Sequence, residues 1–185
     1  MSWQPPERDA FLELGDAARV DEEIAARGER RSRLSRAREV ATWDGTLEDL
    51  AEHRQRVIVR LAGGRSYLGA LVALGRDHVA VRASGGQVVL VRASAIRSLR
   101  PEPGSPAAVA AGDRERSEGR TLVDVIGRLA EERARVVLGL EDVDELLAGV
   151  LLGLGEDVIT LRVEPGEAGV VYVPTAAVRE LLLDP

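Results

Sequence analysis

Side chains capable of acid–base or nucleophilic chemistry are few and scattered in this chain. Asp77 with His78 is the most suggestive acid and base pair. Because adjacent residues on a strand point to opposite faces, we expect these two side chains not to orient one another for proton transfer. His53 falls in a predicted helix and is interpreted as part of a solvated helix face. The serines lack a nucleophile elbow or a triad context, so the sequence predicts no enzyme.

Cofactor and metal chemistry have little basis in the composition. The chain of 185 residues has no cysteine and two histidines, which excludes disulfides and thiolate metal sites. The pairs Gly63-Gly64 and Gly85-Gly86 are isolated turn signals with no helix after them, unlike a phosphate loop or a dinucleotide fingerprint. We therefore expect no cofactor, no metal and no small-molecule substrate.

An internal duplication is the most informative feature of the chain. Leu50-Ala51-Glu52-x-Arg54-x-Arg56-Val57 recurs 79 residues later as Leu129-Ala130-Glu131-x-Arg133-x-Arg135-Val136. The motif Gly-x-Leu-x-x-Leu-Gly-x-Asp then occurs at residues 69–77 and again at residues 149–157, and residues 91–99 match residues 173–181. The shift grows from 79 to 80 and then to 82, so the insertions fall between strands, where loops tolerate them.

Each copy predicts a short helix and five short strands with glycine-rich turns. The helices are expected over residues 46–55 and 121–134, where Thr46 and Thr121, each followed three residues later by Asp, suit N-terminal caps. The strands of the first copy are expected at 57–59, 67–74, 78–82, 88–91 and 95–99, and those of the second at 136–140, 146–154, 158–163, 170–173 and 177–181. In each copy a glycine interrupts the long second strand, which favours the curvature of a closed barrel.

The composition and the remaining segments complete the predicted organisation. We expect an N-terminal helical arm over 1–45, a first barrel over 46–101, a linker over 102–120 and a second barrel over 121–185. The first barrel carries 9 Arg and 4 acids and the second 5 Arg and 13 acids, so their net charges are opposite. No apolar run of transmembrane length and no signal-peptide pattern occurs, so we expect a cytoplasmic protein that does not enter a membrane.

A helix followed by five bent strands, with Gly-x-Leu-x-x-Leu-Gly-x-Asp on the second strand and its turn, resembles the Sm-like small β-barrel in both copies. The whole layout is similar to a group of actinobacterial proteins in which an N-terminal helical segment precedes two such barrels. The resemblance implies a mainly β fold with helices (α+β), with two tandem five-stranded barrels. It also implies binding of single-stranded RNA. Val79 and Ile159 replace the asparagine that the Sm pattern has at that place, and Ala93 and Thr175 replace its glycine.

Nucleic-acid binding is the alternative function, and it depends on the basic first copy. Phosphate contacts need only suitably placed cations, although the sequence pI near 5.1 is opposite to the usual footprint of such proteins. The candidate contacts to single-stranded RNA or DNA are Arg54, Arg56, Arg60, Arg65, Arg76, Arg82 and Arg92.

The leading hypothesis is a non-catalytic module for macromolecular interaction, acting by protein binding or self-association in a regulatory role. Opposite charges on the two copies and the exposed strand edges expected of small open barrels favour it. The candidate interface residues are Trp3, Phe11, Tyr67, Val89, Val91, Val171, Tyr172 and Val173. For the arginines of the arm we favour a solvated helix face over contact with nucleic acid or an acidic partner, because acids precede them in the order that suits a helix dipole.

Overall fold

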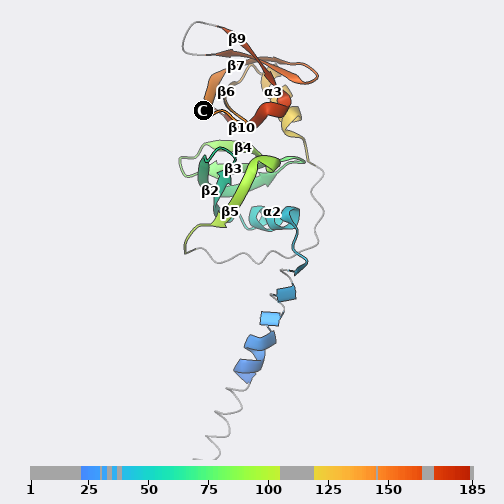
Figure 1. Ribbon diagram of the computed structural model, residues 1–185, viewed down its shortest axis with the longest axis vertical. Helices are drawn as coiled ribbons and strands as arrows, with labels where there is room; N and C mark the ends of the chain where they lie inside the picture. Colours follow the sequence, from blue (N-terminus) through green and yellow to red (C-terminus); the bar gives the residue numbers. More distant parts are fainter. Residues whose placement is uncertain are drawn as a thin grey trace, which may run out of the picture.

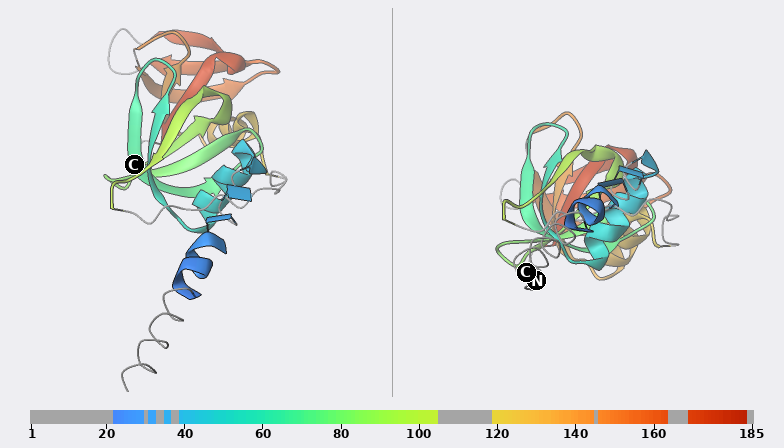
Figure 2. Two further views of the ribbon diagram at one scale, coloured as in Figure 1. Left: turned by 60° about the horizontal axis from the view of Figure 1, so that its bottom comes forward. Right: turned by 90° about the horizontal axis from the view of Figure 1, so that it is seen from below.

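The computed structural model of the chain describes residues 22–29, 31–32, 35–36, 39–104, 119–144, 146–163 and 169–183. These residues form a mainly β structure with helices (Figure 1). Residues 22–29 are helical and lead away from the sheet in Figure 1 and in the left view of Figure 2. Trp3, Phe11 and most of the predicted linker lie outside the described residues.

The two copies of the repeat fold alike. The first unit comprises α2 (Trp43–Glu52), β1 (Arg56–Leu61), β2 (Ser66–Leu74), β3 (His78–Ala83), β4 (Val88–Arg92), the 3-10 turn η1 (Ala93–Ala95) and β5 (Ile96–Pro101). The second unit comprises α3 (Leu122–Glu131), β6 (Arg135–Leu140), β7 (Leu146–Leu154), β8 (Val158–Val163), β9 (Val170–Pro174), the 3-10 turn η2 (Thr175–Ala177) and β10 (Val178–Leu183). All ten predicted strands are confirmed, each within two residues at either end.

The prediction of two closed barrels is wrong. All ten described strands form one antiparallel sheet in the order β5-β1-β2-β3-β4-β10-β6-β7-β8-β9. Within the first unit β5 pairs with β1, but β4 pairs with β10 of the second unit instead of closing onto β5. The sheet therefore stays open, because the hydrogen-bonding edge that closure needs is occupied by a strand from the other repeat.

The helix starts agree with the sequence in one unit and differ in the other. Thr121 is the N-cap of α3 and forms a capping box with Asp124, as expected. The cap at Thr46 is wrong: α2 begins at Trp43, and the hydroxyl of Thr42 accepts the Gly45 N–H at 2.9 Å. Thr42 is the residue that matches Thr121 under the shift of 79. The repeat therefore locates the helix better than the local Thr-x-x-Asp pattern does.

Both helices end in the same way, on an arginine with positive φ. Arg54 has φ 47° and Arg133 has φ 50°. In the first unit the Arg54 N–H donates to the Ala51 carbonyl and the Gln55 N–H to the Leu50 carbonyl, which is a Schellman motif. The same pair of bonds follows α3. The repeated Ala-Glu-x-Arg motif therefore has a structural role, since it ends each helix.

Glycine on the second strand of each unit allows a close approach of two backbones. A Cβ atom at Gly69 would lie 2.2 Å from the Arg82 carbonyl oxygen, and one at Gly149 would lie 2.2 Å from that of Arg162. No side chain fits at that distance. The glycines that the sequence motif repeats are thus required where β2 crosses β3 and where β7 crosses β8.

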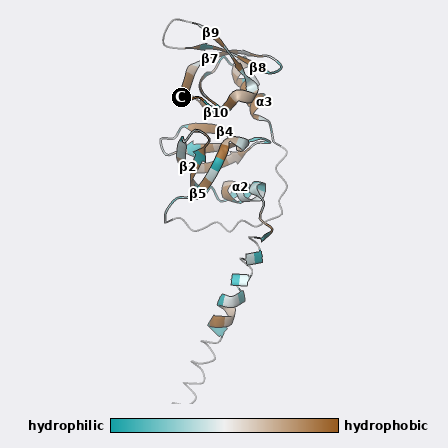
Figure 3. Cartoon of the chain, in the orientation of Figure 1, coloured by the Kyte–Doolittle hydropathy of each residue, from teal (hydrophilic) through white to brown (hydrophobic). Residues whose placement is uncertain are grey.

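The apolar core continues from one unit to the other. The buried cluster of the second unit includes Ala80 and Leu90 from the first unit. The buried cluster of the first unit includes Leu182 from β10. Figure 3 shows apolar residues along β10, where the two clusters meet. The two repeats are therefore packed as one body, with β10 between their cores.

Candidate protein-interaction edges

The inner junction is the contact between β4 and β10, and it joins the two repeats by strand pairing. Val91 is paired with Glu180, Leu90 with Leu181 and Val89 with Leu182. Both strands are rich in β-branched and aliphatic residues, which suit a strand that is covered on its faces. The junction therefore combines backbone hydrogen bonds with an apolar contact from both units.

A first polar contact fixes the inner junction near η2. The Arg92 guanidinium donates to the Val178 carbonyl at 2.8 Å and to the Thr175 carbonyl at 2.9 Å. It also lies 3.4 Å from the Asp77 carboxylate, which accepts the Leu122 N–H at 2.7 Å. The first unit thus caps the N-terminus of α3 with an acid, the charge that a helix N-terminus favours.

A second polar contact lies beside β10 and is buried at Glu180 and Arg179. The Glu180 carboxylate lies 3.3 Å from Arg65 Nε and 3.2 Å from Arg179 Nη2, and both Glu180 and Arg179 are inaccessible to solvent. Arg179 also donates to the Ala62 carbonyl at 2.7 Å. Removing one partner of a buried ion pair leaves an uncompensated buried charge, so we expect these contacts to be sensitive to substitution.

Tyr67 lies next to this group. Burial raises the pKa of Tyr67 above its ordinary value, the Glu180 carboxylate raises it further, and Arg65 lowers it. Among the described residues, the buried side-chain atoms without a hydrogen-bond partner are the Tyr67 hydroxyl, Glu180 Oε2 and Arg179 Nε. Tyr67 was predicted as an interface residue, and the structure places it against the inner junction.

The expectation that Asp77 and His78 do not orient one another is wrong. His78 Nδ1 lies 3.2 Å from Asp77 Oδ1, because Asp77 belongs to the turn and β3 begins only at His78. The imidazole is buried over Gly75, where a Cβ atom would lie 2.1 Å from the ring. The Asp77 carboxylate also contacts Leu122 and Arg92, so Asp77 belongs to the inner junction and His78 lies beside it.

The outer edges are β9 at one end of the sheet and β5 at the other, and no described strand pairs with their outward sides. They lie at opposite ends of the two units (Figure 1). Tyr172 on β9 is 70 % exposed, and Val170 on the same face of that strand is also exposed. Trp43, the first residue of α2, is 43 % exposed in the unit that carries β5. The β9 edge thus has a large apolar side chain in solvent, and the unit that carries β5 has a second one on its helix.

The predicted interface residues divide between these two places. Val89 and Val91 are buried in the inner junction. Val171, Tyr172 and Val173 lie on β9, where Val173 is buried and Tyr172 is exposed. Trp43 was missed by the sequence analysis, and the signal that could have found it is its match to Leu122 under the repeat shift.

The seven candidate nucleic-acid arginines do not form one group. Arg65 and Arg92 are engaged in the inner junction, Arg54 ends α2, and Arg56 forms an ion pair with Glu102 that raises its pKa. Arg76 is exposed. Hydrogen bonds from Thr121 lower the pKa of Asp124, and the charge of Arg76 adds a smaller lowering. Arg60 and Arg82 are exposed on β1 and β3.

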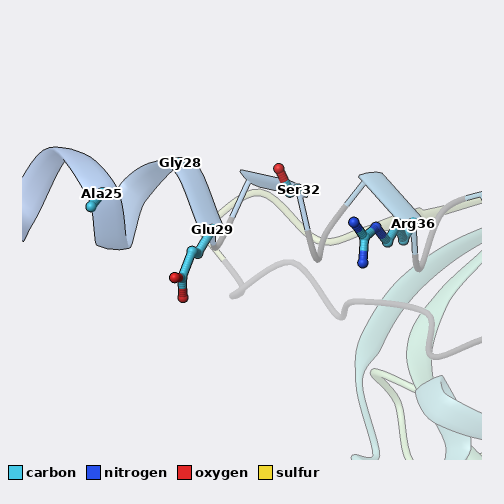
Figure 4. Close-up of a pocket in the computed structure, with 5 residues that line it drawn as sticks. All are labelled: Ala25, Gly28, Glu29, Ser32 and Arg36. Carbon is cyan, nitrogen blue, oxygen red and sulfur yellow. The ribbon is translucent and has the colours of Figure 1, made fainter.

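Other features of the described residues add no chemical site. The hollow lined by Ala25, Gly28, Glu29, Ser32 and Arg36 runs along one side of the arm and is open to solvent (Figure 4). No cluster of three or more His, Asp or Glu side chains suited to a metal ion occurs in the described part of the chain. Among the same residues, no helix has the length and apolar character needed to cross a bilayer.

Comparison with known proteins gives no relative: the chain matches no protein-family model, no curated protein and no solved structure.

Proposed function

We propose that this protein is a non-catalytic protein-interaction module that binds an extended partner strand along β9. In this proposal the two repeats are Sm-like units joined in one open sheet. The observation that carries the proposal is Tyr172, whose large apolar side chain is 70 % exposed on β9, an edge strand whose outward side pairs with no described strand. Exposed apolar edge strands readily pair with another chain. Main-chain hydrogen bonds then supply affinity, and the side chains on one face supply specificity.

The chain itself provides an example of the binding mode. The edge of β4, which matches β9 in the repeat, is covered by β10 through antiparallel pairing. Charged side chains, which protect edges in other proteins, are absent from Val170 to Val173, and the proline of β9 is its last residue, Pro174. The strand β9 is therefore equipped to accept a partner strand in the way that β4 does.

A photo-crosslinking residue tests this proposal directly. Benzoylphenylalanine is placed at Tyr172 of the full chain, with Ser84, exposed after β3, as the matched control site. We expect adducts from position 172 to map to an extended protein segment and to disappear when Val170→Arg is added on the same face. An absence of adducts above the Ser84 control, in both purified protein and cell extract, would exclude β9 as a binding edge.

A second candidate function is binding of single-stranded RNA by the first unit. Arg56 on β1 and Arg82 on β3 both lie opposite Ala70 on β2, so they share a face of the sheet, and Arg60 lies on the same face. This arrangement gives three cations on one face of the basic unit. We expect binding of an RNA pool, followed by fluorescence anisotropy, to weaken steeply with salt and to be lost in Arg60→Glu/Arg82→Glu. Binding unaffected by that variant would exclude this surface.

A further inference from the structure

We propose that the strand bound along β9 is β5 of a second copy of this chain, so that copies join head to tail. This inference rests on the proposed function of β9. In the repeat, β9 matches β4 and β5 matches β10, and the pair β4 and β10 forms the inner junction. The two outer edges are therefore the two halves of a junction that the chain has already formed once. Joining them between copies produces an outer junction.

The exposed apolar residues lie where the inner junction buries their counterparts. Tyr172, 70 % exposed, matches Leu90, which is 7 % exposed against β10. Trp43, 43 % exposed, matches Leu122, which is 0 % exposed at the start of α3. Tyr172 belongs to the β9 side and Trp43 to the β5 side. One contact between copies therefore accounts for both exposed side chains.

Backbone contacts of the inner junction have counterparts that do not depend on side-chain identity. The Arg76 N–H donates to the Arg120 carbonyl at 2.9 Å. The matching groups are the N–H of Glu156 and the carbonyl of Ala41 in a second copy.

An acid also lies where the helix cap requires it. Asp77 accepts the Leu122 N–H, and its counterpart Asp157 is exposed in the turn before β8. Asp157 matches Asp77 in position as well as in type. The main-chain carbonyl of Asp77 accepts the Ala93 N–H, and the main-chain carbonyl of Asp157 accepts the Thr175 N–H in the same way. In the outer junction its carboxylate faces the N–H of Trp43 in the second copy, at the N-terminus of α2.

The charges at the outer edges are complementary. In the inner junction the Arg179 guanidinium lies against the turn of the first unit, and a Cβ atom at Gly63 would lie 2.6 Å from it. The counterpart of Arg179 is Arg97, which is exposed, and the counterpart of Gly63 is Asp142, which is exposed and also has positive φ. The outer junction therefore brings the Arg97 guanidinium of one copy to the Asp142 carboxylate of the next.

Three differences make the outer junction weaker than the inner one. Pro174 replaces Arg92, and Ser98 replaces the buried Glu180, so both polar contacts described above are missing. Val40 replaces Gly119, and a Cβ atom at Gly119 would lie 3.0 Å from Gly75 Cα. In the outer junction the backbone that faces Val40 must therefore shift by a few tenths of an ångström. The inner junction is thus permanent, whereas the outer junction forms and separates with protein concentration.

The repeat also fixes the register of the outer junction. The inner pairs Val91 with Glu180, Leu90 with Leu181 and Val89 with Leu182 transfer to Val173 with Ser98, Tyr172 with Leu99 and Val171 with Arg100. Because the two edges differ, the contact is heterologous, and copies continue to add until the chain of copies closes on itself.

Mixed single-cysteine variants test this register, since the chain has no cysteine of its own. Full-length Tyr172→Cys and Leu99→Cys are mixed under mild oxidation, and the products are identified by mass spectrometry. The control mixture is Tyr172→Cys with Ser84→Cys. We expect a disulfide-linked pair in the first mixture at several times the yield of the control. Light scattering of the unaltered protein is expected to show a mass that rises with concentration.

Three outcomes overturn the inference, and they separate it from the proposed function. Disulfides within Tyr172→Cys alone would mean that β9 pairs with β9. Equal yields in both mixtures, with a monomer at every concentration, would exclude self-association. Adducts of benzoylphenylalanine at position 172 with a different protein would sustain the binding role of β9 while excluding a second copy. Only an absence of all adducts overturns both proposals.

Discussion

Glu180 lies over Gly139: a Cβ atom at Gly139 would lie 2.3 Å from Glu180 Oε1. The two residues are cross-strand partners on β10 and β6. At the matching pair of the first unit the sizes are reversed, with Arg60 opposite Ser98. Gly139 leaves room for Glu180, and Ser98 leaves room for Arg60. Of the two large residues, Glu180 contacts the other repeat, through Arg65.

The glycine in this pair gives the first prediction. We expect Gly139→Ala to lower the free energy of unfolding by about 2 kcal/mol, because the added carbon overpacks a buried site. The double variant with Glu180→Ser should cost less than the sum of the two single variants. Urea denaturation of the four proteins gives the coupling energy. Additive effects would contradict direct contact between the two side chains.

Tyr67 gives a prediction at alkaline pH. The folded state raises the pKa of the phenol, so the folded protein keeps this proton where the unfolded chain loses it, above about pH 10. Stability contributed in this way is present below that pH and declines as the pH rises further. We expect Tyr67→Phe to reduce the loss of stability above about pH 10, measured by urea denaturation at several pH values. The matched control is Tyr172→Phe, which removes a phenol hydroxyl at an exposed position.

Asp77 and Asp157 form a matched pair for the two junctions. We expect Asp77→Ala to lower the free energy of unfolding by about 2 kcal/mol, since it leaves the Leu122 N–H without its acceptor and Arg92 without its acidic partner. Asp157→Ala, at an exposed position, should change it by less than about 0.5 kcal/mol. In sedimentation experiments Asp157→Ala should nevertheless weaken association between copies. The reverse pattern would contradict the assignment of Asp77 to the inner junction.

Arg97 and Asp142 give a charge-exchange prediction. We expect Arg97→Glu and Asp142→Arg each to weaken self-association, and the double variant to recover part of it, because the exchanged charges attract again. Arginine is tolerated at positive φ in this chain, as Arg54 and Arg133 show. Sedimentation at low and high salt measures the effect, which should diminish as salt screens the charges. If the double variant associates less than either single variant, the two side chains do not meet.

The αL arginines give a prediction on stability. We expect Arg133→Gly to raise the free energy of unfolding by up to about 1 kcal/mol, because glycine adopts positive φ without the steric cost that other residues bear. Arg133→Ala should give no gain, since alanine also has a Cβ atom. Thermal denaturation distinguishes the two. An equal gain in both variants would mean that the charge or length of the arginine, and not its backbone, causes the strain.

The local structure follows closely from the sequence, because repetition resolves what single patterns leave open. Two copies of one strand pattern located all ten strands, and the match of Thr42 to Thr121 would have corrected the start of α2. Closure of a barrel cannot be inferred in this way. Whether β4 pairs with β5 or with β10 depends on edges far apart in the sequence, which have similar apolar patterns.

The candidate site was only partly predictable for the same reason. Tyr172 and Val171 were identified from their type and place on the last strands of a repeat, whereas Trp43 attracts notice only beside its buried counterpart Leu122. Arg65 and Arg92 have the composition of a phosphate-binding surface, yet their partners are main-chain carbonyls and acids of the other repeat. Such partners are set by the tertiary fold, and no local spacing encodes them.

The position of β10 in the chain also bears on how the protein is made. Because β10 follows every other described strand, it leaves the ribosome after all of them, and β4 remains an open edge during the whole synthesis of the second repeat. Neighbouring nascent chains on one messenger therefore present complementary edges before either is complete. The order of the strands makes residues 178–183 the segment whose arrival decides between folding within a chain and premature pairing between chains.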